Sequence, residues 1–357
     1  MMDTVRLGII GCGGMCGAHL STLGGKSPHT SEALRPFAGK VEIRGLVDVN
    51  LAKAESHRQK YGGEYVTDDP EKIFKDPKID AVLIATWHDT HAPFSLRAME
   101  CGKHVLIEKP MAMTEKECDD ILAAVDRSGL TYMVAFRSRF AKGANAVKRE
   151  FPKPDNIIAH ARTPGIWSES SWAQDPIKGG GQILSQACHV VDLMFFLAGA
   201  EPESVYATGG VFHHSRPEVI DTINAAVRYK NGSVGAFLGG DGGTGGLLTG
   251  HPLGTGCPFF VMVVDKGRSA IALDHGHNCR FESSVPESVW KKPFDAGNFT
   301  VDLGEAAAGG VPDILPTFAR VILNHETPPA TAVDGARTTR FILRCFESAR
   351  TGKIIKF

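Results

Sequence analysis

The sequence lacks the features that would assign the chain to a membrane, a nucleic acid or a disulfide-stabilised class. No apolar run approaches the roughly 20 residues that a membrane-spanning helix requires. The 39 Lys and Arg residues are balanced by 40 Asp and Glu residues, so no basic surface for nucleic acid is indicated. Eight cysteines are scattered without a C-x-x-C pair, which favours reduced thiols. Met1 to Thr4 lead directly into an apolar strand and leave no room for a signal peptide, so we expect a cytoplasmic protein.

The length of the chain and the order of its strands and helices indicate a globular protein with two cores. Its 357 residues are too many for one ordinary core. Up to about residue 135, continuous apolar strands alternate with helices, which is typical of a parallel sheet covered on both faces. Beyond it, strands joined by tight turns at Asn231-Gly232 and Asp265-Lys266-Gly267 indicate a mostly antiparallel sheet. We therefore predict a doubly wound α/β domain of Rossmann type over residues 1–135 and an α+β domain over 136–357.

An antiparallel sheet with helices on one side leaves its other face open. A second subunit is the simplest cover for such a face, so we expect a homodimer or homotetramer formed through the C-terminal sheet. The glycine-rich stretch Gly239–Gly256 is predicted to be a loop, and whether it serves as a lid or as a linker is left open.

A glycine-rich corner follows the first strand, Val5–Ile10. Gly11 and Gly13 occupy the first two places of a G-x-G-x-x-G pattern, and Cys16 stands in the third. A strand that enters a helix through such a turn directs unpaired backbone N–H groups at one point, which suits a diphosphate. An ordinary tight turn is the alternative, because the chain contains 40 glycines.

The next strand supports dinucleotide binding. Val41–Val47 is apolar and is followed by Asp48, whose carboxylate can accept hydrogen bonds from the adenosine ribose of NAD and would repel the 2′-phosphate of NADP. We therefore expect NAD rather than NADP. Asp48 lies farther from the corner than is usual, and Gly24–Lys40 is interpreted as an insertion that accounts for the difference.

A lysine ends another strand at the same predicted sheet edge. In open parallel sheets ligands bind at the carboxyl ends of the strands, so Lys109 in Glu108-Lys109-Pro110 is placed near a bound nicotinamide. The proline restricts Lys109 to extended geometry and permits a cis peptide bond. The alternative is a surface lysine at a strand end.

One apolar helix carries a single polar stripe. Residues 182–197 are apolar nearly all round, which predicts a buried helix. Ser185, His189 and Asp192 fall at i, i+4 and i+7 on one face, flanked by Gln182 and Gln186. Such a stripe faces either a satisfied hydrogen-bond network or a substrate. Its position after a triple-glycine turn favours the substrate.

Two further groups of residues are interpreted as not catalytic. His275, His277 and Cys279 alternate along a predicted strand, but without an evident fourth ligand we predict no metal site. Cys12 and Cys16 lie in the glycine corner, where a helix N-terminus can lower the pKa of a thiol, and packing is the favoured reason for them.

These segments together resemble the Gfo/Idh/MocA family, named for glucose–fructose oxidoreductase, inositol dehydrogenase and rhizopine catabolism, over essentially the whole chain. The most specific match is the strand Gly102-Lys103-His104-Val105-Leu106-Ile107-Glu108-Lys109-Pro110. The other matching segments are 8–14, 81–86 followed by His91, 179–181 leading to His189 and Asp192, and 347–353.

The resemblance implies an NAD-dependent oxidoreductase that oxidises a secondary hydroxyl of a sugar, a sugar derivative or a cyclitol by hydride transfer to nicotinamide. It implies that Lys109 is the catalytic lysine and that His189 transfers the proton. Cofactor contacts are expected from Gly11, Gly13, Gly14, Met15, Asp48, Thr86, His88, His91, Glu108 and Lys109. Substrate contacts are expected from Lys109, Arg137, Arg139, Trp167, Trp172, Ser185, Gln186 and His189.

The chain departs from the family pattern at two places. Ser185 stands where the family often has an Asp four residues before the histidine, and Trp87-His88 stands where Pro-Asn is usual. Loss of the Asp removes a group that would orient His189, so proton transfer is expected to depend on His189 and Lys109. Two alternatives stay open: a redox-neutral, NAD-using glycosidase-type enzyme, and a non-catalytic nucleotide-binding regulator.

Overall fold

The chain divides into two compact units. The computed structural model describes residues 3–23, 30–164, 168–243, 259–273, 278–283, 299–301, 311 and 313–357. One unit comprises Met1–Arg137 and Gly309–Arg337, and the other comprises Ser138–Ala308 and Thr338–Phe357. The first boundary lies close to the predicted one at residue 135. The prediction that residues 136–357 form one continuous domain is wrong, because Gly309–Arg337 returns to the first unit.

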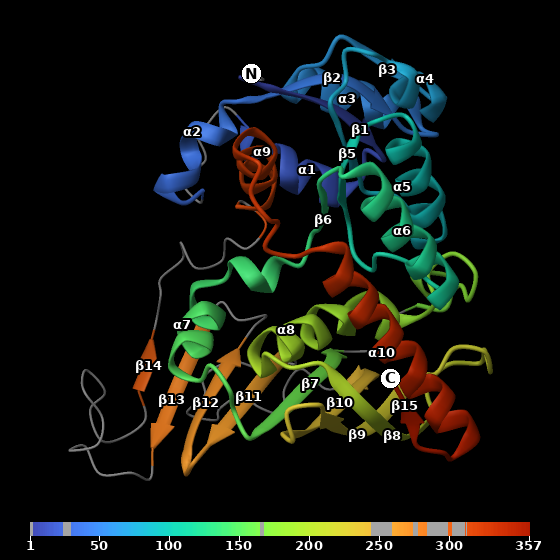
Figure 1. The fold of residues 1–357 in the computed structure, drawn as a ribbon. Helices are drawn as coiled ribbons and strands as arrows, with labels where there is room; N and C mark the ends of the chain where they lie inside the picture. The colour runs from blue at the N-terminus through green and yellow to red at the C-terminus, as the bar shows by residue number, and fades with distance from the viewer. Residues whose placement is uncertain are drawn as a thin grey trace. The chain divides into compact units, whose positions relative to one another are not determined.

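The first unit is built on a six-stranded parallel sheet in the order β3-β2-β1-β4-β5-β6 (Figure 1). This order, with β2 and β4 flanking β1, confirms the doubly wound α/β prediction. Its strands are β1 (Val5–Ile10), β2 (Val41–Val47), β3 (Tyr65–Thr67), β4 (Ala81–Ile84), β5 (His104–Ile107) and β6 (Tyr132–Val134). Its helices include α1 (Gly14–Leu20), α2 (Arg35–Ala38), α3 (Leu51–Tyr61), α4 (Pro70–Lys75), α5 (His91–Glu100), α6 (Glu115–Ser128) and α9 (Ile314–Asn324).

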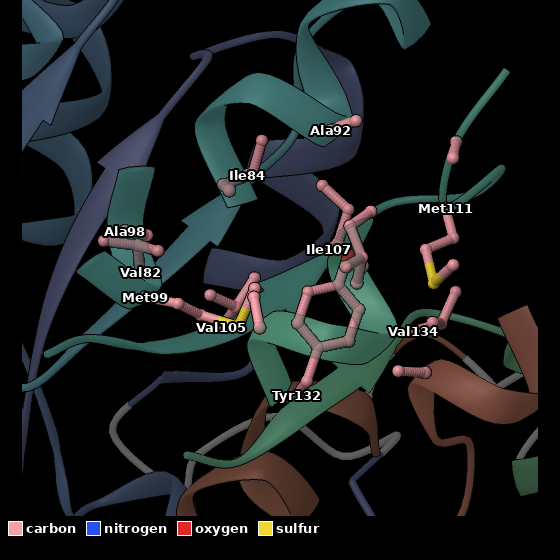
Figure 2. Packing of buried hydrophobic residues seen from close by; sticks show 14 of the residues in the cluster. Val82, Ile84, Ala92, Ala98, Met99, Val105, Ile107, Met111, Tyr132 and Val134 are labelled. Carbon is pink, nitrogen blue, oxygen red and sulfur yellow. The ribbon is translucent and has the colours of Figure 1, made fainter. Parts of the chain in front are cut away.

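One apolar core of the first unit lies between the sheet and helices α5 and α6. Aliphatic side chains of β4 and β5 meet apolar residues of α5, as Figure 2 shows for Val82, Ile84, Ala92, Ala98, Met99, Val105 and Ile107, and Val134 of β6 lies beside Met111. Tyr132 is buried among them, and its hydroxyl lies 3.1 Å from that of Ser95. Continuous apolar strands of this kind are expected in a sheet that is covered on both faces.

The residues at both ends of helix α6 explain where the helix begins and ends. The Thr114 hydroxyl accepts the Glu117 N–H at 3.1 Å, and the Glu117 carboxylate accepts the Thr114 N–H at 2.9 Å. This capping box satisfies two of the N–H groups that a helix start leaves without partners. The helix ends at Gly129, whose φ of +62° is the left-handed conformation that glycine adopts readily.

Helix α9 explains the return of the chain to the first unit. Its buried face includes Leu315, Phe318 and Val321, and the helix packs against α1, α2, β1 and β5. An amphipathic helix has to bury its apolar face, but its sequence does not state which of two cores will receive it. The domain boundary therefore could not be predicted at this point.

The second unit is built on a nine-stranded sheet in the order β14-β13-β12-β11-β7-β10-β9-β8-β15. Among the described strands, β7 and β10 pair in parallel and the other neighbours pair antiparallel, which confirms the mostly antiparallel prediction. The strands are β7 (Asn156–Pro164), β8 (Pro202–Gly210), β9 (Thr222–Tyr229), β10 (Val234–Gly243), β11 (Phe259–Asp265), β12 (Arg268–Leu273), β13 (Asn278–Ser283), β14 (Phe299–Val301) and β15 (Ile355–Lys356). The Asn231-Gly232 and Lys266-Gly267 hairpins form as predicted, with Gly232 and Gly267 at positive φ.

Helices cover one face of this sheet. Helix α8 (Cys188–Ala198) packs on β7 and β11, and α7 (Lys142–Glu150) packs on β12 and β13. Helix α10 (Ala332–Thr351) contributes Phe341, which meets Phe195 of α8 edge-on, with ring centres 5.2 Å apart. The turn that precedes α8, Ile183–Ala187, is a π-helix, so the predicted helix is not regular throughout. Within the part of the chain that the structure describes, no helix combines the length and apolarity needed to cross a membrane.

Candidate active site

The glycine corner after β1 requires a glycine at its first position. Gly11 has a φ of +91°, and a Cβ atom placed there would lie 2.5 Å from the Ala85 carbonyl oxygen and 2.8 Å from the Thr86 side chain. Both the backbone conformation and the close approach of β4 therefore exclude other residues. The corner is thus packed directly against Thr86, one of the expected cofactor contacts.

Gly13 and Gly14 are glycines for a different reason. Gly13 has an ordinary φ of −84°, and a Cβ atom on Gly13 or Gly14 would meet nothing within 4 Å. The protein itself does not need glycine at these positions. Open space beside the backbone at the start of α1 is what a diphosphate needs in order to reach the N–H groups. Met15 follows with 42% of its surface exposed. The corner therefore fits a dinucleotide.

Asp48 ties the end of β2 to this corner. One carboxylate oxygen accepts the Cys12 N–H and the other accepts the Asn50 N–H, both at 2.8 Å. A carboxylate oxygen can accept a second hydrogen bond, so Asp48 keeps acceptor capacity for ribose hydroxyls while its orientation is fixed.

The two thiols of the corner are packing groups. Cys12 and Cys16 are buried. A hydrogen bond with Cys12 and burial both raise the pKa of Cys16 far above its ordinary value. A reactive thiol needs a lowered pKa. For Cys16 the structure therefore agrees with the prediction that packing accounts for the residue.

The turn after β4 carries Thr86, Trp87, His88 and His91. The Thr90 hydroxyl lies 2.7 Å from that of Thr86 and donates to the Trp87 carbonyl at 2.8 Å, which fixes the backbone of the turn. Trp87 is 46% exposed, whereas His88 is buried with its ring 5.5 Å from that of His91. The Trp87-His88 departure from the family pattern therefore puts an exposed indole beside the turn.

His91 makes contacts that the sequence did not predict. The ring is fully buried, with Nδ1 2.7 Å from the Pro110 carbonyl oxygen and Nε2 3.3 Å from the Thr86 carbonyl oxygen. Burial lowers the pKa of His91, so the ring is neutral at pH 7. Both ring nitrogens face protein carbonyls, which leaves neither for the cofactor contact expected of this residue.

Glu108 is likewise engaged inside the first unit. Its carboxylate accepts a hydrogen bond from His19 Nε2 at 2.7 Å, in a pair that is buried on both sides. Burial by itself would raise the pKa of Glu108, but the His19 hydrogen bond and the neighbouring positive charges outweigh it, and the pKa lies below its ordinary value. Glu108 is therefore an anion. His19 was missed by sequence reasoning because its partner lies 89 positions away.

Lys109 follows Glu108 at the carboxyl end of β5 and precedes Pro110, whose carbonyl His91 contacts. Its backbone N–H lies 3.3 Å from the Glu108 carboxylate, and the Lys109-Pro110 peptide is cis. The carboxyl ends of β1, β2, β4 and β5 share one edge of the parallel sheet. Gly11, Asp48, Thr86 and Lys109 therefore follow neighbouring strands at the edge where such sheets bind ligands.

In the second unit, the triple-glycine turn precedes the polar stripe as predicted. Gly180 and Gly181 have positive φ, and the Gly181 N–H donates to the Ala173 carbonyl at 2.8 Å. Ser185 and His189 are buried on the helical segment that follows, and Gln186 is half-buried. The turn is thus attached to the short helix Trp172–Gln174, which carries the half-buried Trp172.

Asp192, at the far end of the stripe, belongs to an internal ion pair. Arg139 donates to both carboxylate oxygens of Asp192 at 2.7 and 2.9 Å, and the pair is buried. At Asp192 the stripe therefore faces a satisfied hydrogen-bond network, the first of the two alternatives considered from the sequence. Arg139, expected to orient substrate, has its guanidinium engaged in this pair. Arg137 is half-buried, and Trp167 and His275 and His277 lie outside the described residues.

A second buried network near the triple-glycine turn has no counterpart among the predictions. His214 Nε2 lies 2.7 Å from the Asp241 carboxylate, which also accepts a hydrogen bond from Gln174 at 2.9 Å. These contacts join the Trp172–Gln174 helix to β10 and to the segment that follows β8. The three residues are separated in the sequence and share no motif, so no sequence pattern predicted that they would form a network.

A parallel sheet with a glycine corner, an acidic residue after β2 and a lysine after β5 is the arrangement expected of a dinucleotide-binding domain. Residues 5–136 match the family described as "Oxidoreductase family, NAD-binding Rossmann fold", and residues 153–246 match the "GFO/IDH/MocA C-terminal domain". The chain belongs to the Gfo/Idh/MocA family of oxidoreductases. The resemblance noted from the sequence is thereby confirmed.

Named relatives show the range of this family. The chain is 24% identical over 245 residues to myo-inositol 2-dehydrogenase of Thermotoga maritima, a match that covers 65% of this chain and 67% of that protein. It is 27% identical over 273 residues to levoglucosan dehydrogenase of Pseudarthrobacter phenanthrenivorans, with 66% and 67% covered. The chain thus spans about two thirds of the length of these relatives.

A solved structure extends the likeness to the whole chain. The structure of a levoglucosan dehydrogenase in complex with NADH and levoglucosan superimposes with a TM-score of 0.79 over 99% of both chains, at 21% identity. At this identity the likeness shows the fold.

Proposed function

We propose that this protein is an NAD-dependent dehydrogenase that oxidises a secondary hydroxyl of a sugar, a sugar derivative or a cyclitol. The observation that carries the proposal is Lys109, anchored at the carboxyl edge of the parallel sheet beside a corner with open space for a diphosphate. The named relatives act on inositol and levoglucosan, both of which carry ring hydroxyls. This makes a polyhydroxylated ring the favoured substrate class.

In the proposed mechanism, Lys109 stabilises the negative charge on the substrate oxygen and His189 accepts the proton of the hydroxyl. The bound nicotinamide supplies the hydride acceptor. Lys109, as a cation, stabilises the alkoxide that develops as the substrate hydroxyl loses its proton. His189 receives that proton, a task that suits an imidazole whose ordinary pKa is about 6.5. Because Ser185 replaces the usual Asp, no carboxylate stands one turn before His189 on its own helix.

NAD is proposed as the cofactor in preference to NADP because of Asp48. Its carboxylate is held in place by the Cys12 and Asn50 N–H groups, so it cannot easily turn away from a ligand in the corner. A fixed negative charge favours two ribose hydroxyls and opposes a 2′-phosphate.

A second copy of the chain is proposed to cover the open face of the nine-stranded sheet. A row of apolar side chains crosses five neighbouring strands in register, and it consists of Ala226, Ala236, Ile158, Met262 and Ile271. Tyr206, Val234 and Leu238 on this face are 44%, 43% and 36% exposed. An apolar sheet face that extends over five strands is typically buried against another chain.

The assay that tests the proposed function is NADH formation across a panel of inositols, aldoses, anhydrosugars and glycosides, with NAD and NADP in parallel. We expect turnover of at least one ring polyol, with NAD preferred. Tight NADH binding without net reduction across the panel would contradict the proposal. Cleavage of a glycoside under these conditions would then indicate the redox-neutral enzyme, and no turnover of any kind would indicate the regulator.

A further inference from the structure

The segment Glu108-Lys109-Pro110 is held by a buried histidine on each side. We propose that His19 and His91 are positioning residues that fix the place of Lys109, His19 through the carboxylate of Glu108 and His91 through the carbonyl of Pro110. The inference deepens the proposed function and rests on it, because it assigns both histidines a role in the reaction only through Lys109.

His19 secures the residue before the lysine. It lies on α1, the helix that follows the glycine corner, and its ring is fully buried. A carboxylate accepts hydrogen bonds and cannot donate them, so the 2.7 Å contact is His19 Nε2–H donating to Glu108. The other oxygen of Glu108 lies 3.3 Å from the Lys109 N–H. Since an unpaired buried carboxylate is costly, Glu108 keeps this position only while His19 is present.

His91 secures the residue after the lysine. Proline has no N–H, so its carbonyl is the backbone group by which Pro110 can be anchored through a hydrogen bond. A neutral imidazole has a single N–H, and the shorter contact, 2.7 Å from Nδ1 to the Pro110 oxygen, identifies Nδ1 as the donor. The ring is fully buried at the first residue of α5, immediately after the turn that contains Thr86.

Together the two contacts leave the Lys109 backbone little freedom. The residue on either side is tied to a different helix, α1 on one side and α5 on the other, and the Glu108 N–H also donates to Ile84 of β4 at 2.9 Å. The Lys109 side chain remains half-buried beyond these anchors. A displacement of about 1 Å in a catalytic group can reduce a rate by about 100-fold, so small losses of anchoring are measurable in kcat.

Asn and Gln carry the same amide group on side chains of different length. Substituting each histidine by both residues therefore tests whether the position of the N–H donor matters, with its chemistry unchanged. The amide nitrogen of Gln lies near the place of a histidine Nε2, and that of Asn lies near the place of Nδ1. His19→Gln and His91→Asn therefore keep an N–H donor near the Glu108 carboxylate and the Pro110 carbonyl. His19→Asn and His91→Gln instead place the amide nitrogen too far from, or too close to, these acceptors. We expect kcat within about threefold of wild type for the first pair and a fall of about 10- to 100-fold for the second.

A double-mutant cycle tests whether the effect passes through Lys109. In the Lys109→Ala background, His19→Asn and His91→Gln should change the residual rate by less than about threefold, because no lysine is left to place. Thermal unfolding and NADH affinity, measured by fluorescence on all variants, report any general damage. A merely structural role would reduce kcat by the same factor in both backgrounds.

The outcomes distinguish this inference from the proposed function. If Lys109→Ala retains the wild-type kcat, the proposed role of Lys109 fails and the inference fails with it. If Lys109→Ala is impaired but the Asn and Gln variants at each histidine are indistinguishable from one another, the inference alone is overturned. Equal losses with and without Lys109 would overturn it as well.

Discussion

At the scale of single residues, Gly11 and Gly13 belong to the same motif but are glycines for different physical reasons. Gly11 is required by the fold, since its positive φ and the 2.5 Å approach to Ala85 exclude a side chain. Gly13 is surrounded by open space, and its conformation suits any residue. Its lack of a side chain serves a ligand that has to reach the backbone.

This contrast gives a first prediction. Gly11→Ala should lower the free energy of unfolding by about 1–3 kcal/mol through backbone strain, measured by chemical denaturation. Gly13→Ala should leave stability within about 0.5 kcal/mol of wild type. It should instead raise the Kd for NADH by about tenfold or more, because the new methyl group occupies the space of the diphosphate. Unchanged NADH affinity in Gly13→Ala would contradict the assignment of the corner.

A second residue-scale prediction concerns pH and His91. Burial lowers the pKa of His91 in the folded state, so below about pH 6.5 the unfolded chain takes up a proton that the folded protein excludes. This contribution to stability is complete above the unfolded pKa and is lost as the pH falls from there toward the folded pKa. His91→Asn, which keeps the donor but cannot titrate, should show a smaller decrease in Tm between pH 7.5 and 5.5 than wild type. Equal decreases would show that His91 is not the group involved.

The residues of the site could be predicted from the sequence only where a local pattern carried them. Gly11, Asp48 and Lys109 each follow an apolar strand, and strand ends are visible in sequence. His19 and His214 depend on partners in distant segments, and a lone histidine in an apolar helix or loop gives no signal of its partner. The same limit applies to Arg139, whose pairing with Asp192 spans 53 positions.

At the scale of elements, the regular parts of the fold could be predicted almost to the residue. Strands β1 and β2 coincide with the predicted strands Val5–Ile10 and Val41–Val47, because a glycine or an acidic residue follows each apolar run. Strand β3 and helix α4 were not predicted, since each is too short to show a period. The π-helical turn Ile183–Ala187 has no known sequence signal of its own here. Residues 314–324 fall within the predicted second domain, whereas helix α9 packs in the first unit.

Helix α9 gives the element-scale prediction. Phe318 is fully buried where α9 packs against α1, α2 and the parallel sheet. Phe318→Ala should lower the free energy of unfolding by about 3–5 kcal/mol, because it leaves a cavity in a core shared by two distant segments of the chain. Arg320, on the same helix but only partly buried, offers the control Arg320→Ala, which should cost about 1 kcal/mol or less. Similar losses at both positions would contradict the assignment of α9 to the first core.

At the scale of the whole molecule, the open sheet face sets the expected assembly. Met262 lies in the apolar row that crosses β9, β10, β7, β11 and β12. Light scattering of the wild-type protein should give a dimer or tetramer, and Met262→Lys should shift the mass toward the monomer because a charge in the row would be buried without a partner. Val333→Lys, at an exposed residue of α10, is the matched control and should leave the mass unchanged. A monomeric wild type would exclude this role for the face. The cytoplasmic location stays a prediction.

The central claim is that a secondary hydroxyl carbon gives its hydride to bound NAD. The most direct measurement uses a ring polyol that the panel shows to be turned over, deuterated at the carbon that is oxidised, with mass spectrometry of the released NADH. We expect one deuterium per NADH and a ketone product in equal amount. Unlabelled NADH, or conversion of the polyol or its glycoside without net NADH, would contradict the claim.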